Sequence, residues 1–206
     1  MPAKTVEKKE RPKPREAAKH AAKSDINVYT EELGGWQRSH YSAEITPEMD
    51  GKTVLVMGWA RALRGGAKIA FIQLADREGS VQITAKQGVV APALMEKLLR
   101  LNREDVIAVK GTVKANKEAP NGVEIIPLEL KVLSRSEPTL PLEVVTKKTP
   151  AEFPTRLDVR FMDLRKPEVA AIFSIKDAVT TAMRNYLESN GFLEIHSPKI
   201  IAEASE

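Results

Sequence analysis

The amino-acid sequence predicts a small all-β barrel of five strands and one helix, followed by the beginning of an α+β domain. Three observations support this prediction. Short β-rich segments alternate with turn signals between residues 53 and 132. One short helical pattern interrupts them after the third segment. A long amphipathic helical pattern then begins near residue 168, beyond a proline-rich stretch.

The first half of the barrel is predicted as three consecutive strands. Residues 53–61 are β-rich and apolar on much of both faces. Residues 63–67 supply a turn, because their two glycines tolerate positive φ. Residues 69–74 form the second strand, and 80–85 form the third, with apolar and polar residues alternating. The tight turn between them is 76–79.

A helix and two further strands complete the barrel. The helix is predicted over residues 91–100 and the fourth strand over 106–113. The fifth strand, 123–132, follows the Asn121-Gly122 turn, and Pro127 within it indicates a bulge or an edge. Three strands, a helix and two strands are the order of the OB-fold, a five-stranded Greek-key barrel that binds oligonucleotides. A small β-sandwich would have a similar number of strands.

Positive charge gathers at the N-terminus. Residues 1–23 hold eight Lys or Arg and three acidic residues, whereas the whole 206-residue chain has a net charge of +4. The rest is therefore almost neutral. We predict that residues 1–35 form a basic disordered tail, which would attract a polyanion by counterion release. A solvated leader without a binding role is the alternative.

Several classes of protein are excluded by composition. No apolar run is long enough to span a bilayer, and the basic N-terminus lacks the apolar core of a signal peptide. The chain has no cysteine, which rules out disulfides and thiolate metal sites. No glycine-rich phosphate cradle or compact Ser/His/Asp set is present, and the three histidines are far apart. We expect a cytoplasmic protein with no metal site and no catalytic residues in this chain.

The last third of the chain changes in character. Five prolines between residues 136 and 167 predict a hinge without regular elements. A helix over 168–190 follows, with Pro167 in its first turn and Gly191 after its end, and then a short strand over 192–195. The predicted organisation is a tail (1–35), the barrel domain (36–135), the hinge (136–167) and the incomplete beginning of another domain (168–206).

Four stretches resemble the class II aminoacyl-tRNA synthetases. Asn-Gly-Phe-Leu-Glu-Ile-His-Ser-Pro-Lys-Ile at 190–200, after a long helix, resembles their motif 1. Arg-Phe-Met-Asp-Leu-Arg-Lys-Pro at 160–167 resembles the segment that links barrel and catalytic domain in the aspartyl, asparaginyl and lysyl subgroup. Phe71-Ile72 and residues 76–82 are similar to the anticodon-binding strands of that subgroup. Order and spacing agree from about Trp36 onward.

Within the subgroup, residues 161–165 and 195–201 look aspartyl-like, of the archaeal and eukaryotic type. The asparaginyl enzymes are the near alternative. The resemblance implies a full-length enzyme that makes aspartyl-adenylate from aspartate and ATP, with Mg²⁺, and transfers aspartate to tRNA. It also implies a homodimer formed through motif 1, in which Pro198 lies at the interface.

The resemblance assigns anticodon contacts to two residues of the second and third strands. Phe71 would stack on a base, which contributes roughly 1–3 kcal/mol, whereas a core phenylalanine is the alternative. Gln82 would hydrogen-bond the central U of the anticodon, since unstacked bases are read on their Watson–Crick edges. A solvent-facing strand glutamine is the other interpretation.

Three further contacts are implied around them. Glu124 would accept hydrogen bonds from the first anticodon base, unless it is a surface glutamate beside a turn. Arg61 and Arg64 would contact phosphates or the third base. The run Arg64-Gly65-Gly66-Ala67 stands where Arg-Asp-Leu-Gly is usual in bacteria. This difference leaves open whether tRNA-Asn is charged as well as tRNA-Asp.

The catalytic half of the resemblance is incomplete. Glu206, the last residue, matches the glutamate that holds the α-ammonium of the aspartate substrate. Motifs 2 and 3 are absent, so we expect this chain alone to be inactive and to bind ATP and Mg²⁺ poorly. The apolar face of the 168–190 helix is expected to be exposed and to favour association.

A different class of function is a non-enzymatic OB-type protein that binds single-stranded nucleic acid. Such binders place several aromatic residues on their binding strands. Phe71 is the only aromatic residue in the predicted second and third strands, and 5% of the chain is aromatic. The sequence therefore favours the ligase over the general binder.

Overall fold

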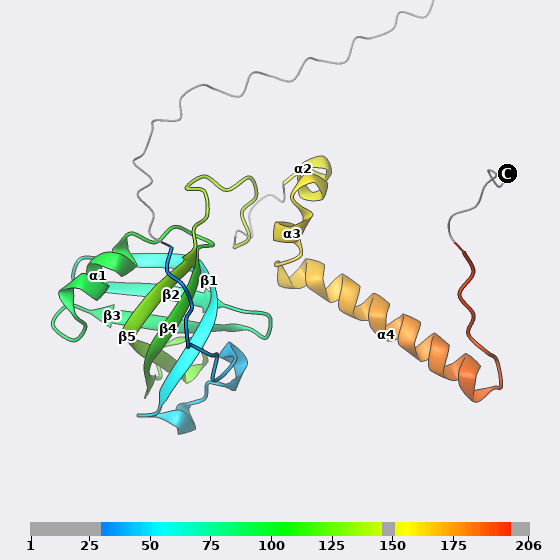
Figure 1. Cartoon of the computed structure of the whole chain (residues 1–206), viewed down its shortest axis with the longest axis horizontal. Coiled ribbons are helices and arrows are strands. Elements are labelled where there is room, and N and C mark those ends of the chain that lie inside the picture. Colours follow the sequence, from blue (N-terminus) through cyan, green and yellow to red (C-terminus); the bar gives the residue numbers. More distant parts are fainter. Residues whose placement is uncertain (1–29, 146–150, 199–206) are drawn as a thin grey trace, which may run out of the picture.

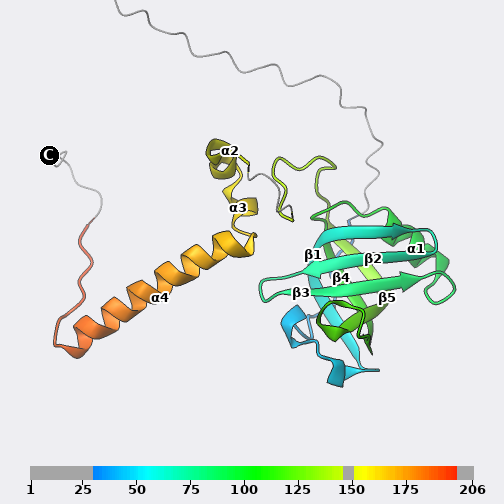
Figure 2. The ribbon, with the colours of Figure 1, turned by 180° about the vertical axis from the view of Figure 1, so that it is seen from behind.

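A computed structural model describes residues 30–145 and 151–198 of the chain. A barrel stands at its N-terminal side, and a long helix projects from a short linking region (Figures 1 and 2). The five strands are β1 (Thr53–Gly66), β2 (Ile69–Ala75), β3 (Ser80–Lys86), β4 (Val106–Ala115) and β5 (Val123–Ser134).

The strands close into a barrel in the order β1-β2-β3-β5-β4. All neighbouring pairs are antiparallel except β3 and β5, which run parallel through Gln82↔Glu124 and Ile83↔Ile125. Helix α1 (Pro92–Leu99) lies between β3 and β4 in sequence and packs on the barrel through Leu94, Met95 and Leu98. The predicted OB-fold is confirmed, and the β-sandwich alternative is excluded.

The barrel interior is aliphatic because the strands alternate. Residues 70, 72 and 74 of β2 and 81, 83 and 85 of β3 point inward, so the residues between them face outward. Gly58 lets β1 and β2 approach, since a Cβ there would lie 2.2 Å from the carbonyl oxygen of Ala75. The largest fully buried side chains are Ile72, Leu74, Ile83, Ile107, Ile125, Val54, Val56, Val109, Val113, Val123 and Val132.

Two irregularities shape the barrel wall. The β1–β2 register shifts between Ala60 and Ala62, which leaves Arg61 as an extra residue in a bulge. The β4–β5 register shifts beside Pro127, as its position in the sequence predicted. β1 is longer than expected and runs through the predicted turn to Gly66, so the chain reverses at residues 67–68. Gly65, at φ +104°, makes this reversal possible.

The segment before β1 is attached to the outside of the barrel. Glu31 N–H donates to the Val132 carbonyl at 2.7 Å, and Ser39 N–H donates to that of Leu55 at 2.9 Å. The 3₁₀ helices η1 (Ser42–Glu44) and η2 (Pro47–Met49) follow, and η3 (Pro120–Gly122) precedes β5. Asp76 holds η1 by accepting the Ser42 backbone N–H at 2.7 Å.

The linking region differs from its prediction. Two short helices, α2 (Phe153–Asp158) and α3 (Arg160–Asp163), form where no regular element was expected. Pro154 occupies the first turn of α2, where a missing N–H costs no helical hydrogen bond. Leu142, Val144 and Met162 make a small second core between this region and the chain that leads to it.

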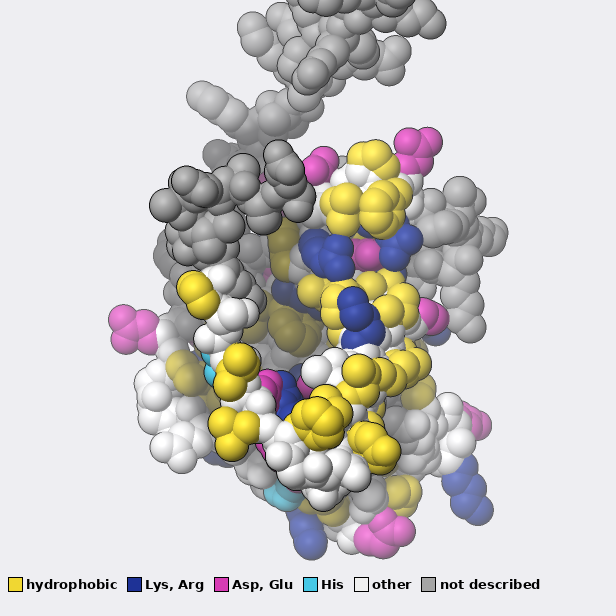
Figure 3. Space-filling view, turned by 90° about the vertical axis from the view of Figure 1, so that its right-hand side faces the viewer, with side chains coloured by type: hydrophobic (Ala, Val, Ile, Leu, Met, Phe, Trp, Pro, Cys, Tyr) yellow, Lys and Arg dark blue, Asp and Glu magenta, His cyan; other side chains and the backbone are white. Residues whose placement is uncertain are grey.

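Helix α4 (Pro167–Ser189) forms almost as predicted, but the strand expected at 192–195 does not. A strand needs a hydrogen-bonding partner, and the described residues provide none for this segment. No residue of α4 is buried. Its exposed apolar side chains include Ile175, Val179 and Met183, and hydrophobic groups gather on this side of the molecule (Figure 3). The expectation of an exposed apolar face is confirmed. None of the described helices could cross a membrane, being too short or too polar.

Candidate nucleic-acid interface

The outer face of β2 and β3 brings several predicted contact residues together. The register places Arg64, Phe71 and Thr84 in one row across β1, β2 and β3. Gln73 and Gln82 stand opposite each other in the next row, and Gln82 pairs with Glu124 of β5. Phe71 is half-buried on this outer face and is not part of the barrel core.

A shallow depression of about 110 Å³ lies on this face. Three of its residues, Arg64, Phe71 and Gln82, are predicted anticodon contacts. The phenyl ring thus lies beside an amide and near a guanidinium, which can provide stacking, base-edge hydrogen bonds and phosphate attraction. The remaining lining residues are Ala62, Gln73, Ser80, Val81 and Pro120.

Glu124 lies beneath this surface. Its side chain is 5% exposed, and its Oε2 accepts a hydrogen bond from Thr84 Oγ1 at 2.5 Å. Gln82 Nε2 lies 3.1 Å from Thr84 Oγ1 and 3.4 Å from Glu124 Oε2. Glu124 is therefore bound to its neighbours in the sheet and is not the surface glutamate that the sequence left as an alternative.

Two polar residues of the face were missed by sequence reasoning. Thr84 follows Gln82 by two positions, so strand alternation puts both on one face, which is a signal that could have identified it. Gln73 faces Gln82 across the β2–β3 pair and donates from Nε2 to Ser80 Oγ at 3.0 Å. Alternation with Phe71 could likewise have placed Gln73 on this face, but its position opposite Gln82 depends on the register.

Arg61 lies elsewhere. Its Nε is 3.8 Å from Glu104 Oε1, too far for a hydrogen bond, while Arg165 Nη1 donates to Glu104 Oε2 at 2.6 Å. The Arg165 guanidinium lies over the Trp59 ring, 4.3 Å from its centroid. Burial lowers the pKa of Arg61 from its ordinary value, an effect that Glu104 opposes and Arg165 reinforces. The bulge thus directs Arg61 toward the linking region, apart from Phe71 and Gln82.

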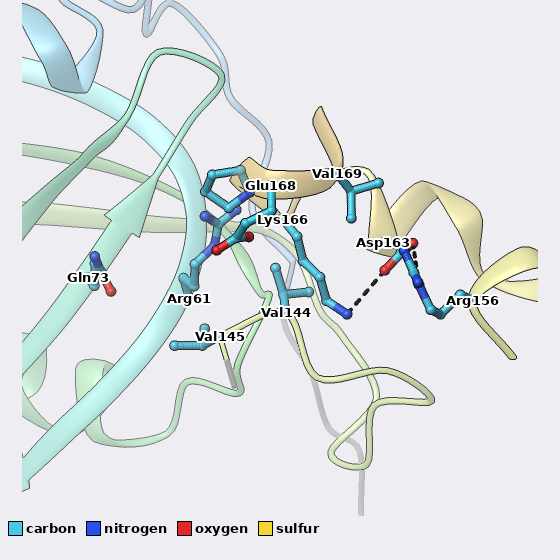
Figure 4. A pocket seen from close by; sticks show the side chains of 10 residues that line it. Arg61, Gln73, Val144, Val145, Arg156, Asp163, Lys166, Glu168 and Val169 are labelled. Carbon is cyan, nitrogen blue, oxygen red and sulfur yellow. Dashed lines mark hydrogen bonds and ion pairs between the residues drawn. The ribbon is translucent and has the colours of Figure 1, made fainter. Parts of the chain in front are cut away.

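A crevice of about 510 Å³ separates the barrel from the linking region (Figure 4). Arg61 and Gln73 line it from the barrel side, while Asp163 pairs with Arg156 at 2.9 Å and Lys166 at 3.1 Å on the other side. Burial alone would raise the pKa of Asp163, but hydrogen bonds from Lys166 and Arg156 lower it below its usual value. The cations of this crevice are engaged with acidic partners.

The predicted catalytic-side residues lie far along the chain. Pro198 is exposed at the end of the described residues, and Glu206 lies outside them. In residues 30–145 and 151–198, no group of three or more His, Asp or Glu side chains is arranged to hold a metal ion.

Two family models match the chain. Residues 54–133 match the OB-fold nucleic acid binding domain of the tRNA anticodon type, and residues 152–206 match the class II tRNA synthetases (D, K and N). The chain thus carries an OB domain of the anticodon-binding type and a segment that matches the class II tRNA synthetases of the D, K and N group, that of the aspartyl, lysyl and asparaginyl enzymes.

Two similar proteins found by sequence are both named aspartate–tRNA(Asp/Asn) ligases. The chain is 50% identical over 171 residues to an aspartate–tRNA(Asp/Asn) ligase of Methanocaldococcus jannaschii, which covers 83% of the chain and 39% of the relative. It is 49% identical over 174 residues to the ligase of that name from Methanothermobacter thermautotrophicus, covering 84% of the chain and 40% of the relative. The chain thus spans about two fifths of the length of these relatives.

Solved structures of the same group share the fold. A putative aspartyl-tRNA synthetase from Leishmania major superposes with a TM-score of 0.74 at 27% identity, over 87% of this chain and 38% of that one. The asparaginyl-tRNA synthetase of Pyrococcus horikoshii with asparaginyl-adenylate gives 0.72 at 30% identity, over 82% and 38%. Enzymes of this class use ATP and Mg²⁺ and act on tRNA.

Proposed function

We propose that the complete protein is an aspartate–tRNA ligase and that this barrel binds the anticodon loop of its tRNA. The observation that supports it best is the depression on β2 and β3, in which the half-buried ring of Phe71 lies beside the amide of Gln82. The choice of aspartate as the amino acid rests on the relatives named as aspartate ligases. The choice of a nucleic acid as the ligand of the barrel rests on the match to the OB-fold family.

Three residues that line the depression, and Glu124 beneath them, have a part in binding. Phe71 stacks on an unstacked anticodon base, contributing roughly 1–3 kcal/mol. Gln82 hydrogen-bonds the Watson–Crick edge of the central U. Arg64, exposed at the rim, attracts a phosphate or contacts the third base. Glu124 is directed at the first base in this proposal, while its contact with Thr84 holds it in place.

The reaction of the complete protein has two steps. The aspartate carboxylate attacks the α-phosphorus of ATP, giving aspartyl-adenylate and pyrophosphate. The terminal adenosine of the tRNA then takes the aspartyl group and AMP leaves. We propose that Glu206 holds the α-ammonium of aspartate. Phosphate charge would be neutralised by Mg²⁺ and arginines, as electrostatic catalysis of such a step requires.

We further propose that the protein is a cytoplasmic homodimer. The support is helix α4, whose apolar residues are exposed along its length. Exposed apolar patches of this kind mark association surfaces. Pro198 follows this helix and would lie at the same interface. The tRNA is tRNA-Asp, with tRNA-Asn as a second substrate, since the archaeal relatives carry both in their names.

Two other functions receive less support. A general single-strand binder would show several aromatic residues on its binding face. Among the residues that line the depression, Phe71 is the only aromatic one. The synthetase match over residues 152–206 also favours the ligase. An asparaginyl enzyme is represented among the structural neighbours, but the relatives at 49–50% identity are named aspartate ligases.

The proposal is tested by titrating the chain with a fluorescent anticodon stem-loop bearing GUC, beside one in which the central U is replaced. We expect tighter binding to the GUC loop, and loss of this preference in Phe71→Ala and Gln82→Ala. Loss of the stacking contact alone should weaken binding roughly tenfold or more.

The controls are Phe153→Ala and Gln87→Ala, which remove exposed residues outside the depression. Both should bind like the unmodified chain. The titrations are repeated at two salt concentrations, because attraction by the basic tail weakens with salt for every sequence alike. Equal affinity for both loops that falls together as salt rises would overturn the anticodon-binding proposal.

A further inference from the structure

A relay of three side chains at the β3–β5 seam connects two buried polar groups with the candidate base-reading amide. Glu124 and Thr84 are 5% and 4% exposed, and Gln82 lies above them at the surface. Thr84 Oγ1 is 2.5 Å from Glu124 Oε2 and 3.1 Å from Gln82 Nε2. The relay crosses from β5 to β3, where the barrel closes.

The chemistry of the three groups determines the direction of every hydrogen bond. A carboxylate only accepts, so the single proton of the Thr84 hydroxyl is donated to Glu124. The hydroxyl oxygen then has only lone pairs left for Gln82. The atom of Gln82 that faces it must therefore be the amide nitrogen, a donor. The oxygen and nitrogen of a glutamine amide can often exchange places without a change in shape. Here only the orientation with Nε2 toward Thr84 gives every hydrogen bond both a donor and an acceptor.

We propose that Thr84, oriented by Glu124, is the positioning residue that makes Gln82 accept uracil and reject cytosine at the central anticodon position. This inference rests on the proposed function of the barrel. With Nε2 held toward Thr84 and Glu124, the carbonyl Oε1 is the group left for a base, and no described residue donates to it.

The two pyrimidines differ at the atom that this carbonyl meets. N3 of uracil carries a hydrogen and donates, whereas N3 of cytosine is a lone-pair acceptor. A base stacked on Phe71 has little freedom to slide, so a fixed Oε1 forms a hydrogen bond with uracil and opposes a lone pair of cytosine. An unrestrained amide would rotate and offer Nε2 to cytosine. The restraint thus produces discrimination that glutamine alone lacks.

Thr84→Val tests this directly, because it removes the hydroxyl and keeps the branched shape. The variant removes the acceptor 3.1 Å from Gln82 Nε2 and leaves only the longer 3.4 Å contact with Glu124 Oε2. Gln82 can then turn over more easily, so the affinity for a GCC loop should rise toward that for GUC. We expect the ratio of the two dissociation constants to fall roughly three- to tenfold, the range for one net hydrogen bond. A purely structural role of Thr84 would weaken binding of both loops equally and leave the ratio unchanged.

The measurement is a fluorescence titration of the 206-residue chain with GUC and GCC stem-loops in identical buffer. Thr84→Ser restores the hydroxyl and should restore the ratio. Thr53→Val is the matched control, since Thr53 is exposed at the start of β1 and pairs with β4, so it does not adjoin β3 or β5. It should leave the ratio unchanged. Taking a ratio also removes the contribution of the basic tail, which acts on both loops alike.

A folded Thr84→Val variant that keeps the original ratio would overturn the inference. If Thr84→Val does not fold, Glu124→Gln decides. The new amide can donate to Thr84, so the Thr84 hydroxyl no longer has to donate to residue 124 and no longer fixes the orientation of the Gln82 amide. The ratio of the two dissociation constants should then fall. An unchanged ratio would refute the inference. If the unmodified chain itself does not prefer GUC over GCC, the proposed function fails, which is a different result from failure at Thr84.

Discussion

At the scale of single residues, the most constrained charge in the structure is Asp105. It is 0% exposed and accepts hydrogen bonds from Arg135 Nη1, the backbone N–H of Asn102 and that of Ser136, each at 2.8 Å. These bonds tie the end of α1 and the chain after β5 to the start of β4. Beside it, Glu104 has φ +66°, an uncommon value for a residue other than glycine, so this corner is held against local strain.

Asp105→Asn should therefore destabilise the barrel sharply. The change keeps the shape, but it replaces one acceptor oxygen by a donor that faces donors, and it leaves Arg135 without its acidic partner. We expect the free energy of unfolding to fall by about 2–4 kcal/mol, measured by urea unfolding followed through tryptophan fluorescence. Glu118→Gln, at an exposed position, should change it by less than about 0.5 kcal/mol. A loss of similar size in both variants would contradict the role given to Asp105.

At the scale of elements, the short helices α2 and α3 depend on one carboxylate. Asp163 joins Arg156 of α2 to Lys166 before α4, and its pKa is lowered by these partners against the effect of burial. A group with a lowered pKa in the folded state stabilises the fold above its unfolded pKa. That contribution is lost as the pH falls through the lower folded value.

The expected consequence is a difference between the unmodified chain and Asp163→Asn that depends on pH. Near neutral pH, Asp163→Asn should unfold more readily, by about 1–2 kcal/mol. The difference should begin to narrow as the pH falls below about 4, where the unfolded carboxylate takes up a proton, and it should close only as the pH falls through the lower pKa of the folded state. Thermal unfolding between pH 3 and 7 measures this, with exposed Asp158→Asn as the control. A gap that stays constant down to pH 3 would show that Asp163 is not stabilised as a carboxylate.

The elements also show which features the sequence could predict. Alternation in residues 69–74 and 80–85 located β2, β3 and their outward faces, because the barrel buries one face only. Prolines suggested an irregular hinge, yet Pro154 begins a helix, since the first turn needs no N–H from it. The displacement of Arg61 could not be predicted, because a bulge becomes evident only when the register of two paired strands is known. Alternation with Gln82 could have located Thr84, but its contact with Glu124 needed the register of β3 with β5.

At the scale of the whole molecule, α4 extends away from the barrel (Figure 2). Its apolar side chains are exposed. Residues 172, 175, 179, 183 and 186 recur at helical spacing, so they lie along one side. The exposed fractions of Ile175, Val179 and Met183 are 64%, 54% and 62%. A surface of this kind is the basis for proposing a dimer through the C-terminal region.

Ile175→Glu should shift the chain from dimer to monomer. A charge in the middle of an apolar contact costs its desolvation and finds no partner there, which corresponds to a weakening of roughly tenfold or more in the dissociation constant. Sedimentation velocity across a concentration series measures the shift. Thr181→Glu adds the same charge on the opposite side of α4 and should leave the dimer intact. An unmodified chain that remains monomeric at all concentrations would refute the dimer.

The seam at which β3 meets β5 has a consequence for how the protein is made. Only two residue pairs close it, and one of them joins Gln82 to Glu124, which are 42 positions apart in the chain. Contacts between residues so distant in sequence form late in folding, because a long loop must be closed first. The β2–β3 hairpin can assemble locally with Phe71 and Gln82 in place, but the amide acquires its orientation only when β5 arrives. A nascent chain could therefore gather RNA through its basic N-terminus before it could distinguish one anticodon from another.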